Sequence, residues 1–231
     1  RSRIVAAGPV VSPLKLTLET FIEGPGNQLA YNAARSIISD EVSPFNPLFF
    51  HGGYGLGKTH LMQGICNEVS RTQPGAKWLY VSAEEFTNQY VLALKTKKLE
   101  AFRRRFRQTD LLAIDDIHFL ASKPSTQEEF LHTFNTIDLA GKKVILASDA
   151  HPKMIGQLCE SLVSRFVSGM VVKIEPPDFK TRCAICAQRA RLMNKNLPDK
   201  VIAYIAENMR TNVRELEGAL LQLVAYASLT N

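Results

Sequence analysis

The chain of 231 residues carries a formal net charge of +6, and 45% of its residues are hydrophobic and 22% charged, an ordinary balance for a globular protein. This length can bury a substantial core and suits one α/β domain with a small helical one beside it. No apolar stretch approaches the roughly twenty residues of a membrane span, and the N-terminus lacks a hydrophobic signal core, so we expect a cytoplasmic protein with no membrane span.

The start of the chain shows no apolar periodicity, and we expect residues 1–18 to be a leader or linker. Thr20 to Asn27 has the composition of a turn, and Asn27 is a candidate cap for the helix that follows. Farther along, short apolar runs predict strands at 48–51, 77–82, 111–114, 143–148 and 171–174, with helical segments between them. Alternating strands and helices predict an α/β fold with a parallel five-stranded sheet covered on both faces.

Gly52 to Thr59 matches the pattern G-x-x-x-x-G-K-[ST] of a phosphate-binding loop. A predicted strand precedes it and a helical pattern from His60 to Ser70 follows it, which is the setting that this loop requires. Its glycines let backbone N–H groups surround a phosphate, Lys58 can reach the β and γ phosphates, and the Thr59 hydroxyl can ligate Mg²⁺. The alternative, a glycine-rich turn without a ligand, does not account for the Lys-Thr pair.

The predicted strand 111–114 leads directly into two carboxylates, Asp115 and Asp116. Because the ends of parallel strands lie side by side, these acids can face a Mg²⁺ ion held at the phosphate loop. We assign Asp115 to the metal and Asp116 to the orientation or activation of the hydrolytic water. An Asp reaches less far than a Glu, which suggests slow turnover. Without the loop upstream, a solvated strand end would be the simpler interpretation.

The segment from Lys95 to Arg107 contains seven cations and one anion, which equals the net charge of the whole chain. Leu99, Phe102 and Phe106 are spaced as one apolar face of a helix, so the cations occupy its other faces. Two interpretations stay open. The segment is either a solvated surface helix or a contact for nucleic acid or an acidic partner.

After Glu175-Pro176-Pro177, a rigid hinge, the pattern becomes wholly helical. We therefore expect an α/β nucleotide-binding domain at 19–175 and a helical domain at 176–231. Cys183 and Cys186 form a C-x-x-C pair within a helix. No second pair or neighbouring histidine completes four ligands, so we interpret both as reduced, half-buried thiols rather than a metal or redox site.

A helix start is predicted near the end of the chain, with Asn212 as its cap and Glu215 three positions later in capping-box spacing. Arg214 would then lie in the first turn, where a cation is unfavourable for the helix dipole. A residue that breaks a local rule in this way invites a functional explanation.

Longer strings of sequence carry a resemblance to a known family, and these strings are Asn46–Leu61, Ile114–Leu120, Gln127–Asn135, Ser164–Phe166, Ile174–Pro177 and Asn212–Leu220. Together they closely resemble the bacterial chromosomal replication initiators, the DnaA family. The likeness runs from about Phe21 to Ala227. It is specific, because the last string and the Gln-Glu-Glu-Phe string are not shared by the wider AAA+ class.

The resemblance implies an AAA+ module, with a nucleotide-binding α/β domain to about residue 175 and a helical lid after it. It also implies that ATP works as an assembly switch, with ATP-bound subunits stacking into a filament that opens origin DNA. The expected cofactors are ATP or ADP, and Mg²⁺. The implied nucleotide contacts lie in the phosphate loop and in the segment from Gly24 to Asn27 beside the adenine: Gly53, Gly55, Leu56, Gly57, Lys58, Thr59, His60, Pro25 and Asn27.

Three further residues match positions of the catalytic machinery. Asp149 matches the first sensor, and Arg214 matches the second sensor, which reaches from the lid to the γ-phosphate. Arg165 matches the arginine finger that a neighbouring subunit offers to bound ATP. From the residues alone, a surface arginine after a turn is the simpler interpretation of Arg165.

Val91, Lys123 and Thr126 match positions that touch single-stranded DNA in the family, whereas Ser125 and Ser161 stand where some members have arginine. The family's C-terminal helix-turn-helix, which contacts double-stranded origin DNA, would begin near Asn231. We therefore expect this chain to be an excised core of an initiator, with helicase and regulatory proteins as further partners.

Two other functions compete with the initiator core. One is a helicase loader or transposition regulator of the same AAA+ class, and sequence beyond Asn231 would separate it from an initiator. The other is a non-enzymatic regulator that holds ADP. Lys58, the Asp115-Asp116 pair and Arg165 together argue against this last function. The origin sequence and the geometry of any oligomer do not follow from the sequence.

Overall fold

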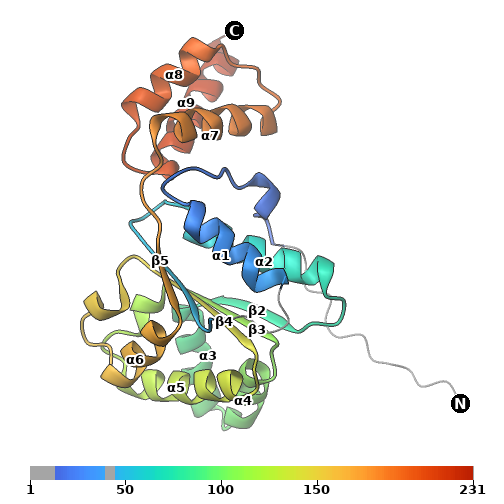
Figure 1. Cartoon of the computed structure of the whole chain (residues 1–231), viewed down its shortest axis with the longest axis vertical. Helices are drawn as coiled ribbons and strands as arrows, with labels where there is room; N and C mark the ends of the chain where they lie inside the picture. The colour runs from blue at the N-terminus through green and yellow to red at the C-terminus, as the bar shows by residue number, and fades with distance from the viewer. Residues whose placement is uncertain (1–13, 40–44, 231) are drawn as a thin grey trace, which may run out of the picture.

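The computed structural model describes residues 14–39 and 45–230, which form a parallel sheet with helices on both faces and a helical part beyond the carboxyl ends of its strands (Figure 1). The strands are β1 (Leu48–His51), β2 (Trp78–Ser82), β3 (Leu111–Asp115), β4 (Lys143–Ser148) and β5 (Met170–Lys173). Their order is β2-β3-β4-β1-β5, and every neighbouring pair is parallel. The strand predictions are confirmed to within one residue at each end.

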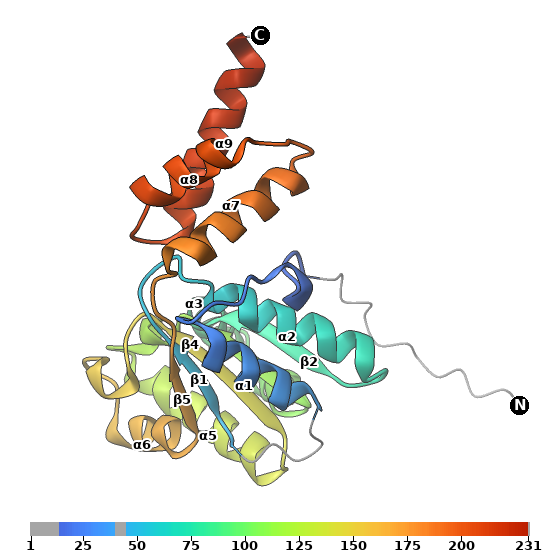
Figure 2. The same cartoon turned by 45° about the horizontal axis from the view of Figure 1, so that its top comes forward.

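The sheet is buried on both faces because the interior positions of its strands are apolar in succession rather than alternately. Phe49 points into a core shared with α3 (Ala83–Lys95), α4 (Leu99–Arg107), α5 (Pro124–Leu139) and α6 (Glu160–Ser168). Its neighbours Leu48 and Phe50 point to the other face, against α1 (Gln28–Ser39) and α2 (Lys58–Thr72). Figure 2 shows both helical layers from a second direction.

Short 3₁₀ helices complete the α/β part: η1 (Leu18–Thr20), η2 (Ile117–Leu120) and η3 (Pro152–Met154). Of the expected leader, residues 1–13 lie outside the described residues. The stretch that follows lies along α2, where the Asn67 side chain bonds the backbone of Leu14 and Leu16 at 2.8–2.9 Å. This stretch is therefore fastened to the core rather than extended away from it.

Asn27 does not cap α1 with its side chain, contrary to the prediction. Its carbonyl accepts the helical bond from the Tyr31 N–H, as a cap residue's does, at 2.9 Å. The side chain instead turns back, where Oδ1 accepts from the Gly24 N–H at 2.8 Å and Nδ2 donates to the Ile22 carbonyl at 3.0 Å. Asn27 thus fixes the turn that precedes the helix.

The C-terminal part consists of α7 (Phe179–Leu192), α8 (Asp199–Asn208) and α9 (Val213–Thr230) around a small core of its own. Asn212 caps α9, since its Oδ1 accepts from the Glu215 N–H at 2.9 Å. Cys186 is buried in this core, and burial raises the pKa of its thiol to about 11, so the thiol stays protonated and unreactive. Among the described residues, no helix is both long and apolar enough to cross a membrane.

Candidate active site

Three neighbouring strands bring the predicted site residues to one edge of the sheet. β4 lies between β1 and β3, and the pairing of His51 with Ser148 aligns the carboxyl ends of β1 and β4. The loop after β1 is therefore adjacent to Asp149, which follows β4, and both lie near the acids at the end of β3. This is the edge at which parallel α/β sheets bind ligands.

The phosphate-binding loop has the backbone that its glycines predict. Gly55 and Gly57 have φ angles of +69° and +101°, which side chains with a Cβ rarely adopt. At Gly55 a Cβ would also lie 3.0 Å from Asn212 Oδ1 and 3.1 Å from Arg214 Cγ, so a larger residue would crowd the lid here. Helix α2 begins at Lys58, which places a helix N-terminus under the loop.

Lys58 is folded into the loop, with 7% of its surface exposed. Its Nζ donates to the carbonyls of Gly52 and Gly53 at 2.6 and 2.8 Å. Burial lowers the pKa of this ammonium group, and the nearby carboxylates of Asp115 and Asp116 oppose the shift. The cation is thus held at the place where a phosphate would meet the loop.

Asp115 is buried and hydrogen-bonded to the loop helix. Its Oδ2 accepts from the Thr59 hydroxyl at 2.7 Å and from the Tyr80 hydroxyl at 2.9 Å. A threonine hydroxyl and a carboxylate in direct contact are the oxygen donors that a phosphate-loop Mg²⁺ site uses, so the residues present fit this ion. Sequence reasoning missed Tyr80, because only the pairing of β2 with β3 brings the two residues together.

Asp116 follows in the left-handed region, with φ of +53°, which turns the chain sharply after β3. Its burial, together with the adjacent charge of Asp115, raises the pKa of its carboxyl group. Asp116 lines a cavity of about 400 Å³ together with Lys58, Thr59 and Arg214. A carboxyl group with a raised pKa in such a cavity is suited to proton handling.

Asp149 lies at the side of the phosphate loop. Its carboxylate accepts from the Tyr54 hydroxyl at 2.8 Å and lies 3.2 Å from Nδ1 of His118. Partial burial opposes ionisation, but the bond from Tyr54 and the proximity of His118 outweigh it and lower the pKa of Asp149. The carboxyl group of Asp149 is therefore ionised at neutral pH, with one oxygen bonded to Tyr54.

The lid touches the phosphate loop directly. The Val213 N–H, in the first turn of α9, donates to the Gly55 carbonyl at 3.0 Å. This contact brings Arg214 to the cavity that Lys58 and Thr59 line. Arg214 is thus unfavourable for the dipole of α9, but this place in the first turn brings it to the cavity beside Lys58.

A smaller hollow of about 50 Å³ adjoins this cavity and is lined by Phe21, Asn27, Leu56 and His60, among others. His60 is engaged there, since its Nε2 lies 2.8 Å from the Thr17 carbonyl and 3.1 Å from the Thr20 hydroxyl. Pro25 is exposed and lines neither hollow, so the structure does not support it as a nucleotide contact.

A larger hollow, about 1080 Å³, lies between α1, α2 and the amino ends of β3 and β4. None of the predicted site residues lines it. The volume of a cavity therefore does not identify the active site in this fold. The candidate site is identified because Lys58, Thr59 and Asp116 line the same cavity.

Four further predicted residues, which the resemblance assigns to a neighbouring subunit or to DNA, lie away from this cavity. Arg165 is exposed on α6 and does not line it, which agrees with a residue that would act on a neighbouring molecule. Val91, on α3, is 38% exposed, and Lys123 is partly exposed just before α5. Thr126 is only 5% exposed, so its burial in α5 argues against a direct DNA contact through its side chain.

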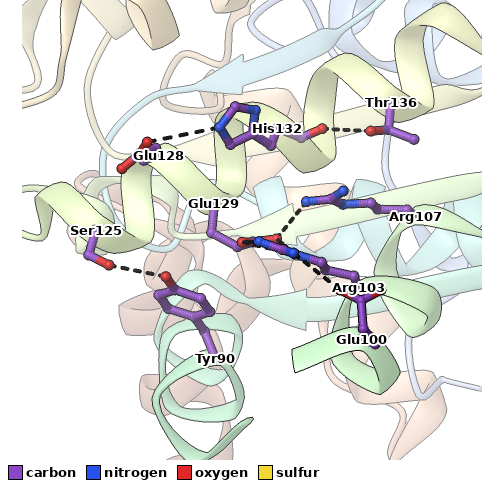
Figure 3. Close-up of polar contacts among 9 residues, drawn as sticks. All are labelled: Tyr90, Glu100, Arg103, Arg107, Ser125, Glu128, Glu129, His132 and Thr136. Carbon is purple, nitrogen blue, oxygen red and sulfur yellow. Dashed lines mark hydrogen bonds and ion pairs between the residues drawn. The ribbon is translucent and has the colours of Figure 1, made fainter. Parts of the chain in front are cut away.

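The basic segment is not the uniformly free surface that its charge suggested. Arg103 and Arg107 of α4 point at Glu129 of α5, with N···O distances of 2.9 and 2.7 Å (Figure 3). Glu129 is 3% exposed, so these two arginines neutralise a buried carboxylate. The cations that remain exposed are Lys95, Lys97, Lys98, Arg104 and Arg105.

Glu129→Ala is expected to lower the free energy of unfolding by about 1–3 kcal/mol, because Arg103 and Arg107 would lose the carboxylate that they share. This loss of stability is smaller than for a fully buried ion pair, because the side chains of Arg103 and Arg107 are 33% and 24% exposed and can be hydrated. Urea denaturation measures it. The neighbouring Glu128→Ala is the control, because the Glu128 side chain is 75% exposed. Equal stabilities of the two variants would contradict a structural role for Glu129.

A phosphate-binding loop, a strand that ends in two acids and a helical lid that touches the loop define a P-loop nucleotide-binding module of the AAA+ class. A family model described as the bacterial DnaA ATPase domain matches residues 14–173. This chain belongs to that family. The match covers the sheet and the site edge described above.

The chain is similar to the chromosomal replication initiator protein DnaA of Caldanaerobacter subterraneus subsp. tengcongensis, with 48% identity over 216 residues, covering 94% of this chain and 49% of the relative. It thus spans about half the length of the curated relatives that it matches. Domain III of the Thermotoga maritima replication initiation protein DnaA superposes with a TM-score of 0.89 and 41% identity, covering 93% of this chain and 89% of that one. The replication initiator DnaA bound to AMPPCP and single-stranded DNA superposes at 0.84 with 42% identity, covering 90% and 64%.

Proposed function

We propose that this chain is the ATP-binding and slowly hydrolysing core of a chromosomal replication initiator, in which ATP drives self-assembly at the origin. The observation that carries this proposal is that Lys58, Thr59 and Arg214 line one cavity, with Asp115 bonded to Thr59 behind it. The sequence identity of 48% to a chromosomal replication initiator favours this function over a helicase loader or transposition regulator. Such a core would act in the cytoplasm on chromosomal DNA, with helicase and regulatory proteins as further partners.

In this function Lys58 and the loop N–H groups bind the β and γ phosphates of ATP or ADP. Thr59 and Asp115 would hold Mg²⁺, which neutralises charge on those phosphates. Asp116 orients the attacking water, and Arg214 places a cation at the γ-phosphate from the lid. Hydrolysis is slow, because Asp116 reaches a shorter distance than a glutamate would.

The core also engages single-stranded DNA in this proposal, with Val91 and Lys123 as contacts. The resemblance of these residues to family contact positions supports it, as does the related initiator whose structure contains single-stranded DNA. Tyr90 and Ser125 join α3 to α5 by a hydrogen bond of 3.1 Å (Figure 3). This bond brings the segments that carry Val91 and Lys123 close to each other.

Single-stranded DNA is expected to bind weakly, with promotion by ATP and little sequence preference. Phosphate contacts release counterions, so affinity should fall with salt at a log–log slope of roughly −0.7 per phosphate contacted. Fluorescence anisotropy across a salt series measures this slope. Lys123→Ala should flatten it, whereas Lys200→Ala, on α8 of the lid, is the control that should not.

Charge reversal in α4 is restricted to Arg104 and Arg105, because Arg103 is tied to Glu129. A flatter slope in that variant would place α4 on the same DNA-binding surface as Lys123. A slope equal to that of the unmodified chain would favour a solvated helix. Binding that responds neither to salt nor to ATP would contradict single-strand engagement altogether.

A further inference from the structure

The Asp149 carboxylate is held from three segments at once. Its Oδ2 accepts from the hydroxyl of Tyr54 in the phosphate loop at 2.8 Å. Its Oδ1 lies 3.2 Å from Nδ1 of His118 in η2 and 3.3 Å from the hydroxyl of Ser148 in β4. This arrangement follows from the strand order, because the loop after β4 lies between the loop after β1 and the turn after β3.

Tyr54 is placed for this contact rather than for packing. The residue is 66% exposed, so its ring contributes little to a core, yet its hydroxyl reaches across to the neighbouring strand end. His118 is more enclosed, with 19% of its side chain exposed, and its ring lies 4.7 Å from that of Phe119. Oδ2 of Asp149 therefore accepts from Tyr54, while Oδ1 accepts from Ser148 and lies beside the His118 ring.

We propose that Tyr54 and His118 are positioning residues for ATP hydrolysis, and that they act through Asp149 by fixing its carboxylate between the phosphate loop and the Asp115-Asp116 turn. This inference rests on the function proposed above. A carboxylate with donors on both oxygens keeps one orientation, whereas loss of a donor lets it rotate. Phosphoryl transfer depends on such placement, since positioning and electrostatics supply nearly all of its catalysis.

Single-turnover hydrolysis of bound ATP tests the inference, with the affinity for ADP measured by calorimetry on the same samples. Tyr54→Phe removes only the hydroxyl group, and it should slow hydrolysis about tenfold, the effect of losing one hydrogen bond to a charged group. Its ADP affinity should stay within about twofold, because the substitution leaves Lys58 and the N–H groups of the phosphate loop unchanged. Tyr226→Phe, at an exposed tyrosine of α9, is the matched control and should match the unmodified chain in both measurements.

For His118, two substitutions separate the loss of a donor from a change of shape. His118→Gln keeps an N–H group that can face Asp149 and should retain most of the rate, whereas His118→Leu should lose about as much as Tyr54→Phe. His132→Leu, at an exposed histidine of α5, is the control. Thermal melting of each variant confirms that it is folded.

The decisive comparison is made in an Asp149→Asn background. If Tyr54 acts through Asp149, then adding Tyr54→Phe to Asp149→Asn should cause little further loss. A full additional loss in that background would overturn the inference, and so would an unchanged rate in Tyr54→Phe alone. An unmodified chain that binds no nucleotide, or binds it without hydrolysis, would overturn the proposed function and the inference together. Normal hydrolysis in the unmodified chain and in Tyr54→Phe alike would overturn the inference only.

Discussion

Lys58→Ala is expected to weaken the binding of ATP and ADP by an order of magnitude or more. Lys58 is the only side chain of the phosphate loop that carries a full charge, and a hydrogen bond to a charged group contributes about 1.5–3 kcal/mol. The ammonium group already lies within the loop, bonded to the Gly52 and Gly53 carbonyls, so little rearrangement is needed to meet a phosphate. Isothermal titration calorimetry with each nucleotide measures the change.

Lys200→Ala, which removes an exposed lysine of α8, serves as the control and should bind both nucleotides normally. Thermal melting without nucleotide shows whether loss of the Lys58 contacts to the loop carbonyls also affects folding. An unchanged nucleotide affinity in a folded Lys58→Ala variant would rule out the phosphate-loop assignment.

Arg165→Ala is expected to leave ATP affinity nearly intact and to abolish ATP-dependent assembly. Arg165 is exposed on α6 and does not line the cavity that contains Lys58 and Arg214, so it does not complete the site of its own chain. A cation supplied by a neighbouring subunit accounts for such a position, and in related sites it changes the rate of hydrolysis by a factor of about 10³–10⁵.

Sedimentation velocity with ATP and with ADP measures assembly, and calorimetry on the same variant measures affinity. Arg191→Ala, at an exposed arginine of α7, is the matched control and should assemble as the unmodified chain does. Loss of ATP binding by monomeric Arg165→Ala would show that this arginine acts within its own chain. Assembly that proceeds normally in the variant would remove Arg165 from the interface.

Sequence patterns that span only a few residues predicted the strands and the phosphate loop correctly. The five strands are short apolar runs bounded by turns, and a buried parallel strand has this pattern whatever lies beside it. The phosphate loop is equally local, since positive φ angles at Gly55 and Gly57 are a property of a few consecutive residues. Asp115 and Asp116 could be placed at a strand end for the same reason.

The side-chain contacts of the site depended on which elements become neighbours. Tyr80 bonds Asp115 across 35 positions and Tyr54 bonds Asp149 across 95, and neither spacing has a signature in the sequence. Only the strand order makes these pairs adjacent, because β2 lies next to β3 and β4 lies between β1 and β3.

The sequence by itself determined the phosphate loop, the two acids after β3 and the class of fold, because hydrophobic periodicity and glycine-rich loops act over a few residues. The tertiary structure alone decided which charges remain exposed. Arg103 and Arg107 have the same sequence character as Arg104 and Arg105, yet the packing of α4 on α5 directs the first two onto buried Glu129. Burial of a charge is a property of the neighbours that surround it, and helix packing brings those neighbours from distant parts of the chain.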